Sequence, residues 1–326
     1  MKKGNISIFV PHLGCPQQCS FCNQKTITGK EKQPASEDVK NAVETALKRK
    51  GYEYEIAFFG GSFTAIDREY MISLLEAAGE YVENGRVKGI RISTRPDFID
   101  DEILGILKEY GVSSIELGAQ SMDDEVLKAN LRGHTSADVE NASRMIKAHG
   151  FELGLQMMTG LYKDTDEKAV ETAKKLIALK PETVRIYPTV VLKNTYLAEL
   201  YEKEEYKPQT VDDAANLCTK LLPLFEEAGI KVIRLGLHAS ENIKKNMVAG
   251  AYHEAFGEIV ESRIMLNKIL QYPPADYEIF VNPKSVSKLK GNQKRNIYFL
   301  IEEGYNIKIT QNDKVKVDEI KVVKVR

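Results

Sequence analysis

The sequence has no tryptophan, only four cysteines among 326 residues, and no apolar run of about eighteen residues, the length that a membrane-spanning helix needs. Without an apolar run of that length we expect no membrane-spanning helix and no association with a membrane. The absence of tryptophan excludes no class of protein. The chain starts Met-Lys-Lys-Gly-Asn and passes directly into a strand-like segment, so we expect no targeting peptide and a cytoplasmic location. Neither sign of charge is in excess, because 46 Lys and Arg residues stand against 47 Asp and Glu residues, so net charge selects no partner.

Three of the four cysteines, Cys15, Cys19 and Cys22, lie close together with the spacing C-x₃-C-x₂-C. A structural zinc site would need a second pair of ligands, and a disulfide framework is not expected in a chain of this length. A [4Fe–4S] cluster takes four thiolates, so a loop that supplies three leaves one iron open for another ligand. The loop therefore predicts a catalytic iron–sulfur site, with a zinc site or an electron-transfer cluster as alternatives. Cys218 lies in an apolar-periodic stretch and is predicted to be a buried packing thiol.

Short apolar or alternating runs recur along the chain, and a helix-period segment follows each of them. This alternation indicates parallel strands with right-handed crossovers, and six or seven such units form an open barrel rather than a complete one. The predicted fold class is α/β, an open partial (β/α)6-type barrel with a small C-terminal α+β appendage. The predicted strands are Ile6–Pro11, Glu55–Gly60, Gly89–Thr94, Ser114–Gln120, Glu152–Thr159, Val184–Val191 and Lys231–His238.

The composition changes after Gln271-Tyr272-Pro273-Pro274, which predicts a large domain over 1–272 and a small one over 273–326. The small domain is predicted to contain a strand, a helix and a hairpin: Tyr277–Val281, Ser285–Glu303, and Asn306–Thr310 with Lys314–Ile320. From Pro283 onward eleven Lys and Arg residues stand against five Asp and Glu residues, a net charge of +6. Either this basic surface contacts the phosphates of a nucleic acid, or it is a solvated surface without a partner. Its predicted helix carries or adjoins Lys284, Lys288, Lys290, Lys294 and Arg295.

Glycine and polar residues follow the predicted strands at their carboxyl ends, where an open parallel barrel binds its ligands. Two adjacent glycines would let the backbone approach a ligand closely, although a tight turn would also need glycine. Arg132 suits a carboxylate by charge-assisted hydrogen bonding. The residues at this end are Gly60, Gly61, Ser62, Ser93, Arg95, Gln120, Arg132, Gln156 and Tyr187.

The cysteine loop, with Phe21 directly before its last cysteine, resembles that of the radical S-adenosylmethionine (SAM) superfamily. In that family the amino and carboxylate groups of SAM chelate the open iron. The resemblance implies a [4Fe–4S] cluster on Cys15, Cys19 and Cys22, and SAM as the second cofactor. It also implies that the barrel-mouth residues bind SAM. Gly60, Gly61 and Ser62 would hold the amino group, with serine in place of the usual acid. Ser93, Gln120 and Gln156 would lie near the ribose, and Tyr187 near adenine. Arg132 would meet the carboxylate, and Arg95 either the carboxylate or a substrate.

Four strings narrow the resemblance to the catalytic subunit of Elongator, a family that modifies the wobble uridine of tRNA. They are Ile92-Ser93-Thr94-Arg95-Pro96-Asp97, Glu116-Leu117-Gly118-Ala119-Gln120-Ser121, Arg132-Gly133-His134 and Ile186-Tyr187-Pro188-Thr189, and the similarity runs from about Ile6 to Leu270. That family spaces its cysteines more widely and carries an acetyltransferase domain, for which 326 residues leave no room. Acetyl-CoA chemistry is therefore not expected, and tRNA is one candidate substrate.

The resemblance implies a radical enzyme. A flavodoxin- or ferredoxin-like reductant would supply the electron, and the 5′-deoxyadenosyl radical would take a hydrogen atom from a substrate. An RNA base is one hypothesis for that substrate, and a peptide or a porphyrin-like metabolite is another. An electron carrier that binds no SAM is the rival from another class, although it has no use for the paired glycines and Arg132. Tyr252, His253 and Glu254 are candidate catalytic residues, or else part of an ordinary helix start.

Overall fold

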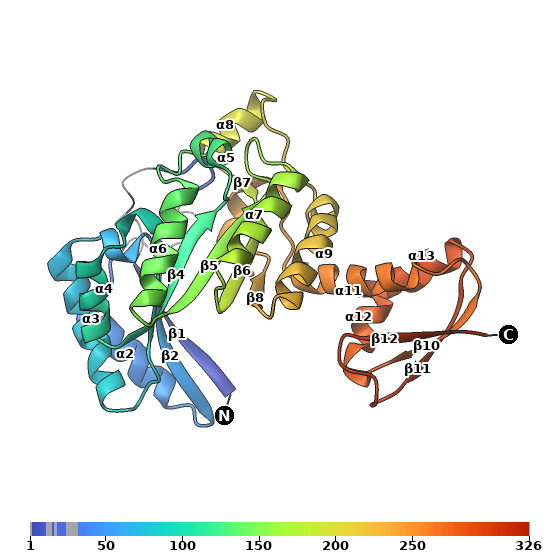
Figure 1. Cartoon of the computed structure of the whole chain (residues 1–326), viewed down its shortest axis with the longest axis horizontal. Coiled ribbons are helices and arrows are strands. Elements are labelled where there is room, and N and C mark those ends of the chain that lie inside the picture. Colours follow the sequence, from blue (N-terminus) through green and yellow to red (C-terminus); the bar gives the residue numbers. More distant parts are fainter. Residues whose placement is uncertain (1, 11–14, 16–17, 24–31, 326) are drawn as a thin grey trace.

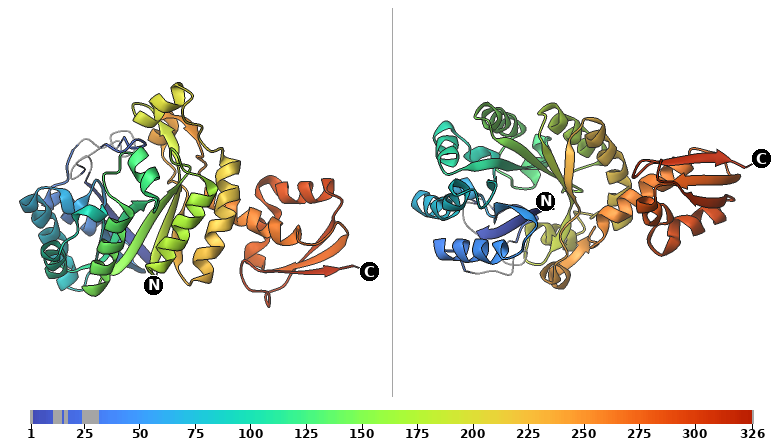
Figure 2. Two further views of the ribbon diagram at one scale, coloured as in Figure 1. Left: turned by 45° about the horizontal axis from the view of Figure 1, so that its top comes forward. Right: turned by 90° about the horizontal axis from the view of Figure 1, so that it is seen from below.

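The structure of the protein, a computed structural model, describes residues 2–10, 15, 18–23 and 32–325. Seven parallel strands form one sheet in the order β1-β2-β3-β4-β5-β6-β8, curled into a half-barrel with helices on its outside (Figures 1 and 2). The predicted α/β fold with a partial barrel is thereby confirmed. The strands are β1 (Lys2–Val10), β2 (Tyr52–Gly60), β3 (Ile90–Thr94), β4 (Val112–Gln120), β5 (Glu152–Thr159), β6 (Thr183–Pro188) and β8 (Lys231–Leu235).

Helices with clear start signals cover the outer face of this sheet. Asp67 and Asp100 cap the second and third of them, each accepting a hydrogen bond from a backbone N–H three residues later. Their apolar stripes pack onto the strands in one main hydrophobic core, which includes Cys218 as a buried packing residue. The helices are α2 (Ser36–Leu47), α3 (Arg68–Glu83), α4 (Asp101–Glu109), α6 (Ser136–Ala148), α7 (Asp166–Ala178) and α9 (Val211–Glu227).

Short elements gather where the parallel strands end, at the top of Figure 1. They are η1 (Phe63–Ala65), η2 (Pro96–Phe98), α5 (Asp124–Ala129), β7 (Val190–Leu192), α8 (Tyr196–Glu202), α10 (Glu241–Asn246) and β9 (Met247–Gly250). Strands β7 and β9 pair antiparallel, outside the main sheet.

Two strand predictions extend too far. The predicted strand Val184–Val191 divides at Thr189, and β7 leaves the sheet to pair with β9, where Gly250 at φ +110° lies against the Thr189 carbonyl. The predicted strand Lys231–His238 ends at Leu235, because Gly236 takes a left-handed φ of +84°. The end of the first predicted strand, Pro11, lies outside the described residues.

The small domain has a three-stranded sheet with β10 (Asp276–Val281) at its centre. β11 (Asn306–Gln311) pairs parallel to one side of β10, and β12 (Ile320–Lys324) pairs antiparallel to the other side. The predicted hairpin is therefore wrong. β10 lies between β11 and β12, and the second predicted strand, Lys314–Ile320, is a turn region that reaches β12 only at Ile320. Helix α11 (Phe256–Ile269) connects the domains and contributes to both hydrophobic cores, with Phe256 and Val260 in the large one and Met265 and Ile269 in the small one.

The predicted helix Ser285–Glu303 is also wrong as a single element. The chain instead forms η3 (Pro283–Ser285), α12 (Val286–Lys290), η4 (Asn292–Lys294) and α13 (Arg295–Glu302). Left-handed φ angles of +74° at Gly291, +50° at Gln293 and +61° at Lys294 break the helix. The predicted basic helix face is therefore not continuous, and Lys288 already forms ion pairs with Glu261 and Asp318, each at 2.9 Å.

Over the described part of the chain, the helices lack the combination of length and apolar character that crossing a bilayer would demand.

Candidate functional site

A cavity of about 290 Å³ opens at the carboxyl ends of the half-barrel strands. It is lined by every residue that the sequence assigns to the cluster or to SAM: Cys15, Cys19, Phe21, Cys22, Gly60, Gly61, Ser62, Ser93, Arg95, Gln120, Arg132, Gln156 and Tyr187. The fold thus brings together residues from the cysteine loop and from five different strand ends.

The cysteine loop is anchored through Ser20, which lies between the last two thiols. The Ser20 backbone N–H donates to the carbonyl of Asn130 at 3.0 Å, and its hydroxyl donates to the Asn130 side chain at 2.7 Å. The Ser20 carbonyl accepts from the N–H of Leu197 in α8 at 2.8 Å. Two elements remote in sequence therefore fix the loop at the cavity.

The thiols on this loop are unfavourable sites for negative charge when no metal is bound. Burial, followed by the nearness of Cys19 and Cys15, raises the pKa of Cys22 to about 12. Burial and Cys19 also raise the pKa of Cys15. Bound metal offsets both effects, because a coordinating thiol is deprotonated outright. Within the described ranges no three Cys, His, Asp or Glu side chains converge as ligands of a single ion. Three thiols facing one cavity are nonetheless the donor set for a [4Fe–4S] cluster with one open iron.

Arg132 connects the cysteine loop to the sheet. Its Nη1 donates to the Sγ of Cys19 at 3.1 Å, and its Nη2 donates to the carbonyl of Gly118 at 2.7 Å. Its Nε is buried with no hydrogen-bond partner, and among the described residues its guanidinium has no carboxylate partner. Arg132 can therefore accept an anionic ligand group such as a carboxylate.

Gln120 is aimed by an irregularity in the sheet. The register between β4 and β5 shifts between Gly118 and Gln120, and Gln120 takes a left-handed φ of +66°. A non-glycine residue held in this conformation stores strain, which is found most often at binding sites. The Gln156 side-chain Nε2 donates to the side-chain Oε1 of Gln120 at 3.1 Å, so the two side-chain amides form one polar edge of the cavity.

The glycine turn after β2 is tied to the end of β3. Gly60 has a φ of +122°, and a side chain there would meet the Val10 carbonyl oxygen at 2.6 Å. The Ser62 hydroxyl is within 2.8 Å of the Thr94 hydroxyl and accepts from the N–H of Arg95 at 3.1 Å. Ser62 is therefore engaged within the protein through its side chain, and its carbonyl also accepts from the N–H of Ala65 at 3.1 Å.

Arg95 lines the cavity but is already paired. Its Nε and Nη2 donate to the carboxylate of Asp97 at 2.9 and 2.7 Å. Its Nη1 is buried without a hydrogen-bond partner in the structure. Of the two arginines predicted for the carboxylate of SAM, Arg132 is thus the one with an uncompensated charge.

Sequence reasoning missed Glu116, a buried carboxylate in the wall of the cavity. Glu116 is 3% exposed and accepts hydrogen bonds from Arg185 on β6 and, at 3.4 Å, from Ser93. Arg185 also donates to the Tyr187 hydroxyl at 3.3 Å and lies over the ring of Phe59. Glu116 belongs to one of the four sequence segments that carry the resemblance. No local signal in that segment predicts its ion pair with Arg185, two strands away in the sheet.

An apolar wall also escaped prediction. It consists of Met158 from β5, Val190 and Leu192 from β7, Leu237 from the loop after β8, and Ile243 from α10. Four of these, Val190, Leu192, Leu237 and Ile243, pack together in a small cluster beside the β7–β9 pairing. No sequence signal marks this wall, because it depends on a strand leaving the main sheet.

The candidate catalytic residues do not line this cavity. The Tyr252 hydroxyl accepts from the N–H of Ser240 at 3.1 Å, and Glu254 pairs with Lys244. His253 accepts from the N–H of Ala255 at 3.0 Å and faces a groove between α11 and the small domain. Their catalytic role stays a prediction.

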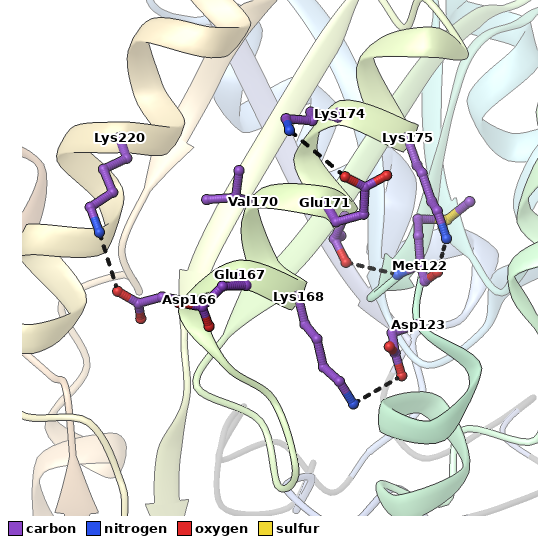
Figure 3. Close-up of a pocket in the computed structure, with 11 residues that line it drawn as sticks. Met122, Asp123, Asp166, Glu167, Lys168, Val170, Glu171, Lys174, Lys175 and Lys220 are labelled. Atoms are coloured by element: carbon purple, nitrogen blue, oxygen red, sulfur yellow. Dashed lines mark hydrogen bonds and ion pairs between the residues drawn. The ribbon is translucent and has the colours of Figure 1, made fainter.

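A second cavity of about 580 Å³ lies outside the barrel, along α7 (Figure 3). Three of its four lysines form ion pairs, Lys220 with Asp166, Lys168 with Asp123 and Lys174 with Glu171, and Lys175 donates to the Met122 carbonyl at 3.0 Å. It contains none of the residues predicted for cluster or SAM, so the barrel-mouth cavity is the candidate functional site.

Comparisons with known proteins agree with this assignment. The sequence model of the radical SAM superfamily matches residues 9–176, and that of the radical SAM C-terminal domain matches residues 181–265. The chain is 33% identical over 216 residues to an uncharacterized protein of Methanocaldococcus jannaschii, which covers 65% of this chain and 63% of that protein.

Two further relatives are named for tRNA modification or for Elongator. A tRNA uridine(34) acetyltransferase of M. jannaschii is 29% identical over 183 residues, 50% of this chain and 34% of that protein. Human Elongator complex protein 3 is 30% identical over 201 residues, 55% of this chain and 37% of that protein. The chain therefore spans between 34% and 63% of the length of these relatives. A solved structure of Methanocaldococcus infernus Elp3 matches with a TM-score of 0.64 and 21% identity, over 83% of this chain and 64% of that one, which supports the fold.

Proposed function

The chain belongs to the radical SAM superfamily, whose members are enzymes, and we propose that it cleaves SAM reductively in the barrel-mouth cavity to abstract hydrogen from a base of a tRNA. The observation that carries the proposal is that every residue predicted for cluster and SAM lines that one cavity. The family implies both cofactors, and the residues present fit them. Three thiols face the cavity, Arg132 Nε is buried without a partner, and Gly60 lies too close to Val10 for a side chain.

In this proposal Cys15, Cys19 and Cys22 hold the cluster. Arg132 binds the carboxylate of SAM, and the turn at Gly60 and Gly61 offers backbone groups to its amino group. When bound, the reduced cluster supplies the electron that converts SAM to methionine and a 5′-deoxyadenosyl radical. The role of the protein is to orient and enclose the reactants. The paired amides of Gln120 and Gln156 form a polar edge of the cavity, and the apolar wall excludes water.

An electron carrier without SAM is a poorer explanation of the same cavity. A carrier needs thiolates and a path for electrons, whereas this cavity extends beyond the thiols to an uncompensated guanidinium and a strained amide. Such features cost stability and are retained where they contact a ligand. The external reductant, flavodoxin- or ferredoxin-like, belongs to the proposal.

A tRNA substrate is supported by two observations. The chain is similar to a protein named as a tRNA uridine(34) acetyltransferase, and the small domain carries an excess of basic residues. Lys290, Lys294 and Arg295 have no carboxylate within ion-pair distance among the residues that the structure describes, in contrast to Lys288. These three cations remain available for phosphates.

The decisive experiment combines two measurements on anaerobically reconstituted, reduced protein. Formation of 5′-deoxyadenosine from SAM tests radical initiation, and mass spectrometry of tRNA nucleosides from cells with and without the gene tests the substrate. No 5′-deoxyadenosine from protein with a full cluster would refute the proposal. Unchanged tRNA nucleosides would refute its tRNA part.

Gly118→Val is expected to weaken SAM binding by at least about tenfold, equivalent to roughly 1.4 kcal/mol. A Cβ at Gly118 would stand 2.9 Å from the Gln120 amide nitrogen and 3.5 Å from Arg132 Nη2, so the larger valine displaces both groups. Equilibrium binding of SAM measures the effect, with iron content as the check that the cluster is intact. Gly105→Val is the matched control, because nothing lies near that position. Equal SAM affinity in both variants would mean that this edge does not touch SAM.

Reversing Lys294 and Arg295 to Glu is expected to weaken tRNA binding for all tRNA sequences. Each lost phosphate contact lowers the slope of log affinity against log salt by about 0.7–0.9. Fluorescence anisotropy across a salt series measures both quantities. Lys48 and Lys50, exposed near the other end of the barrel, provide a control double reversal with the same change of charge. If the control weakens binding equally, the small domain makes no specific contact.

A further inference from the structure

Arg234 on β8 is a second inward-facing arginine of the barrel. The β6–β8 register places it directly beside Arg185. Neighbours across a parallel ladder share a face of the sheet. Arg185 points into the barrel, where it meets Glu116 from β4, so Arg234 faces the interior as well.

The two neighbouring arginines differ in how their charge is compensated. Arg185 has the buried carboxylate of Glu116, whereas Arg234 donates only to the backbone carbonyls of Gly236 and Leu237, each at 3.1 Å. No carboxylate within the described part of the chain lies within ion-pair distance of Arg234. The carbonyls hold the guanidinium in place without neutralising it, which leaves a fixed positive charge at the barrel mouth.

His238, four residues further along the chain, adds an imidazole beside this charge, and the two side chains together form a rim. The His238 side chain is partly exposed, and its ring has no hydrogen-bond partner among the described residues. Partial burial and then the charges of Arg234 and Arg185 lower its pKa, so the three groups are close enough to interact. Between Arg234 and His238 lies Leu237, which lines the cavity. The rim therefore borders the SAM cavity on the side of the last barrel strand.

We propose that Arg234 and His238 form an anion subsite that binds a backbone phosphate of the RNA substrate beside its target base. The inference rests on the proposed function, because it places a substrate group next to the cavity where the radical forms. Strand β8 is an edge strand of the half-barrel, so the subsite lies at one margin of the sheet, beside the cavity that Leu237 lines. A guanidinium matches the geometry of phosphate oxygens, and a neutral imidazole can donate one further hydrogen bond.

The test uses reconstituted holoprotein with SAM bound, and calorimetry with inorganic phosphate, the four ribonucleoside 3′-monophosphates and the four ribonucleosides. We expect at least one monophosphate to bind at least about tenfold more tightly than its nucleoside, and inorganic phosphate to bind weakly at the same site. Arg234→Gln should remove this advantage and leave nucleoside affinity within about twofold. Arg234→Lys should keep part of it, since the charge remains. Lys231→Gln, at the exposed start of the same strand, is the matched control.

Three outcomes would overturn the inference: monophosphates that bind no more tightly than nucleosides, an advantage that survives Arg234→Gln, or a loss of SAM affinity in Arg234→Gln. The last would assign the charge to the carboxylate of SAM. Failure of the proposed function is distinguishable, because it appears as absent 5′-deoxyadenosine formation in the unsubstituted protein. The far-ultraviolet circular dichroism and melting temperature of each variant establish that the loop after β8 remains folded.

Discussion

Replacing Cys15, Cys19 or Cys22 by alanine is expected to abolish binding of the cluster, whereas Cys218→Ala keeps about four irons and four sulfides per chain. The three thiols face one cavity, and with two of them left the cluster lacks a third corner. Cys218 lies in the interior of α9, fully buried in the hydrophobic core. Iron and sulfide analysis after anaerobic reconstitution, together with the ultraviolet–visible spectrum, measures the outcome.

Cys218→Ala is also the control that separates the loss of a cluster ligand from the loss of a cysteine elsewhere in the chain. It removes a buried sulfur and is expected to cost on the order of 1 kcal/mol through the small cavity that it leaves. Loss of the cluster in this variant would contradict the assignment of three ligands and one open iron. A full cluster in any of the three loop variants would contradict it as well.

Glu116→Ala is expected to lower the free energy of unfolding by about 3–5 kcal/mol, because it leaves the guanidinium of Arg185 buried without its counter-ion. The Glu116 and Arg185 side chains are only 4% and 9% exposed. Arg185 would keep its hydrogen bond to the Tyr187 hydroxyl, but a neutral partner does not compensate a buried charge. Urea denaturation of the protein without cofactors, followed by circular dichroism, measures the effect.

The matched control is Glu102→Ala, which removes the partner of Arg68 on the surface. Those two side chains are 74% and 41% exposed, so the expected cost is about 0–1 kcal/mol. An equal loss of unfolding free energy in the two variants would show that the buried Glu116–Arg185 ion pair contributes no more to stability than a surface ion pair. Glu116→Gln, which keeps a hydrogen-bond acceptor, should fall between wild type and Glu116→Ala.

The barrel and the residues that line its cavity were predictable because the relevant signals are local. Alternating strand and helix patterns determine that the strands run parallel, and parallel strands place their carboxyl ends at one edge. Gly60, Gln120 and Tyr187 each end a strand, so their meeting in one cavity follows from that rule. The cysteine spacing is equally local.

The pairing of Glu116 with Arg185 could not be predicted, since it joins residues on β4 and β6 across the curvature of the sheet. The apolar wall required β7 to leave the sheet, and Val190 looks like a continuation of β6 in the sequence. In the small domain, Gln293 and Lys294 adopt left-handed backbone angles that their residue types do not favour. Tertiary packing overrides local preference in each of these cases.

The cavity is shared between the two segments that match separate family models. The cysteines, Arg132 and Gln156 lie within residues 9–176, whereas Tyr187, Leu237 and Ile243 lie within residues 181–265. The first segment supplies the thiols and most polar residues, and the second supplies most of the apolar wall. The cavity is therefore complete only when the two segments fold as one unit.

A half-barrel that stays open has two edge strands, and exposed strand edges invite pairing with a second chain and eventual aggregation. Within the described sheet no strand lies beyond β1 or β8. β1 presents exposed Lys3, Asn5 and Ser7, and β8 is only five residues long with exposed Lys231 at its start. The pairing of β8 with β6 is irregular as well. Charge, shortness and irregularity each oppose edge-to-edge association, so the open sheet is protected against pairing with other copies of the chain.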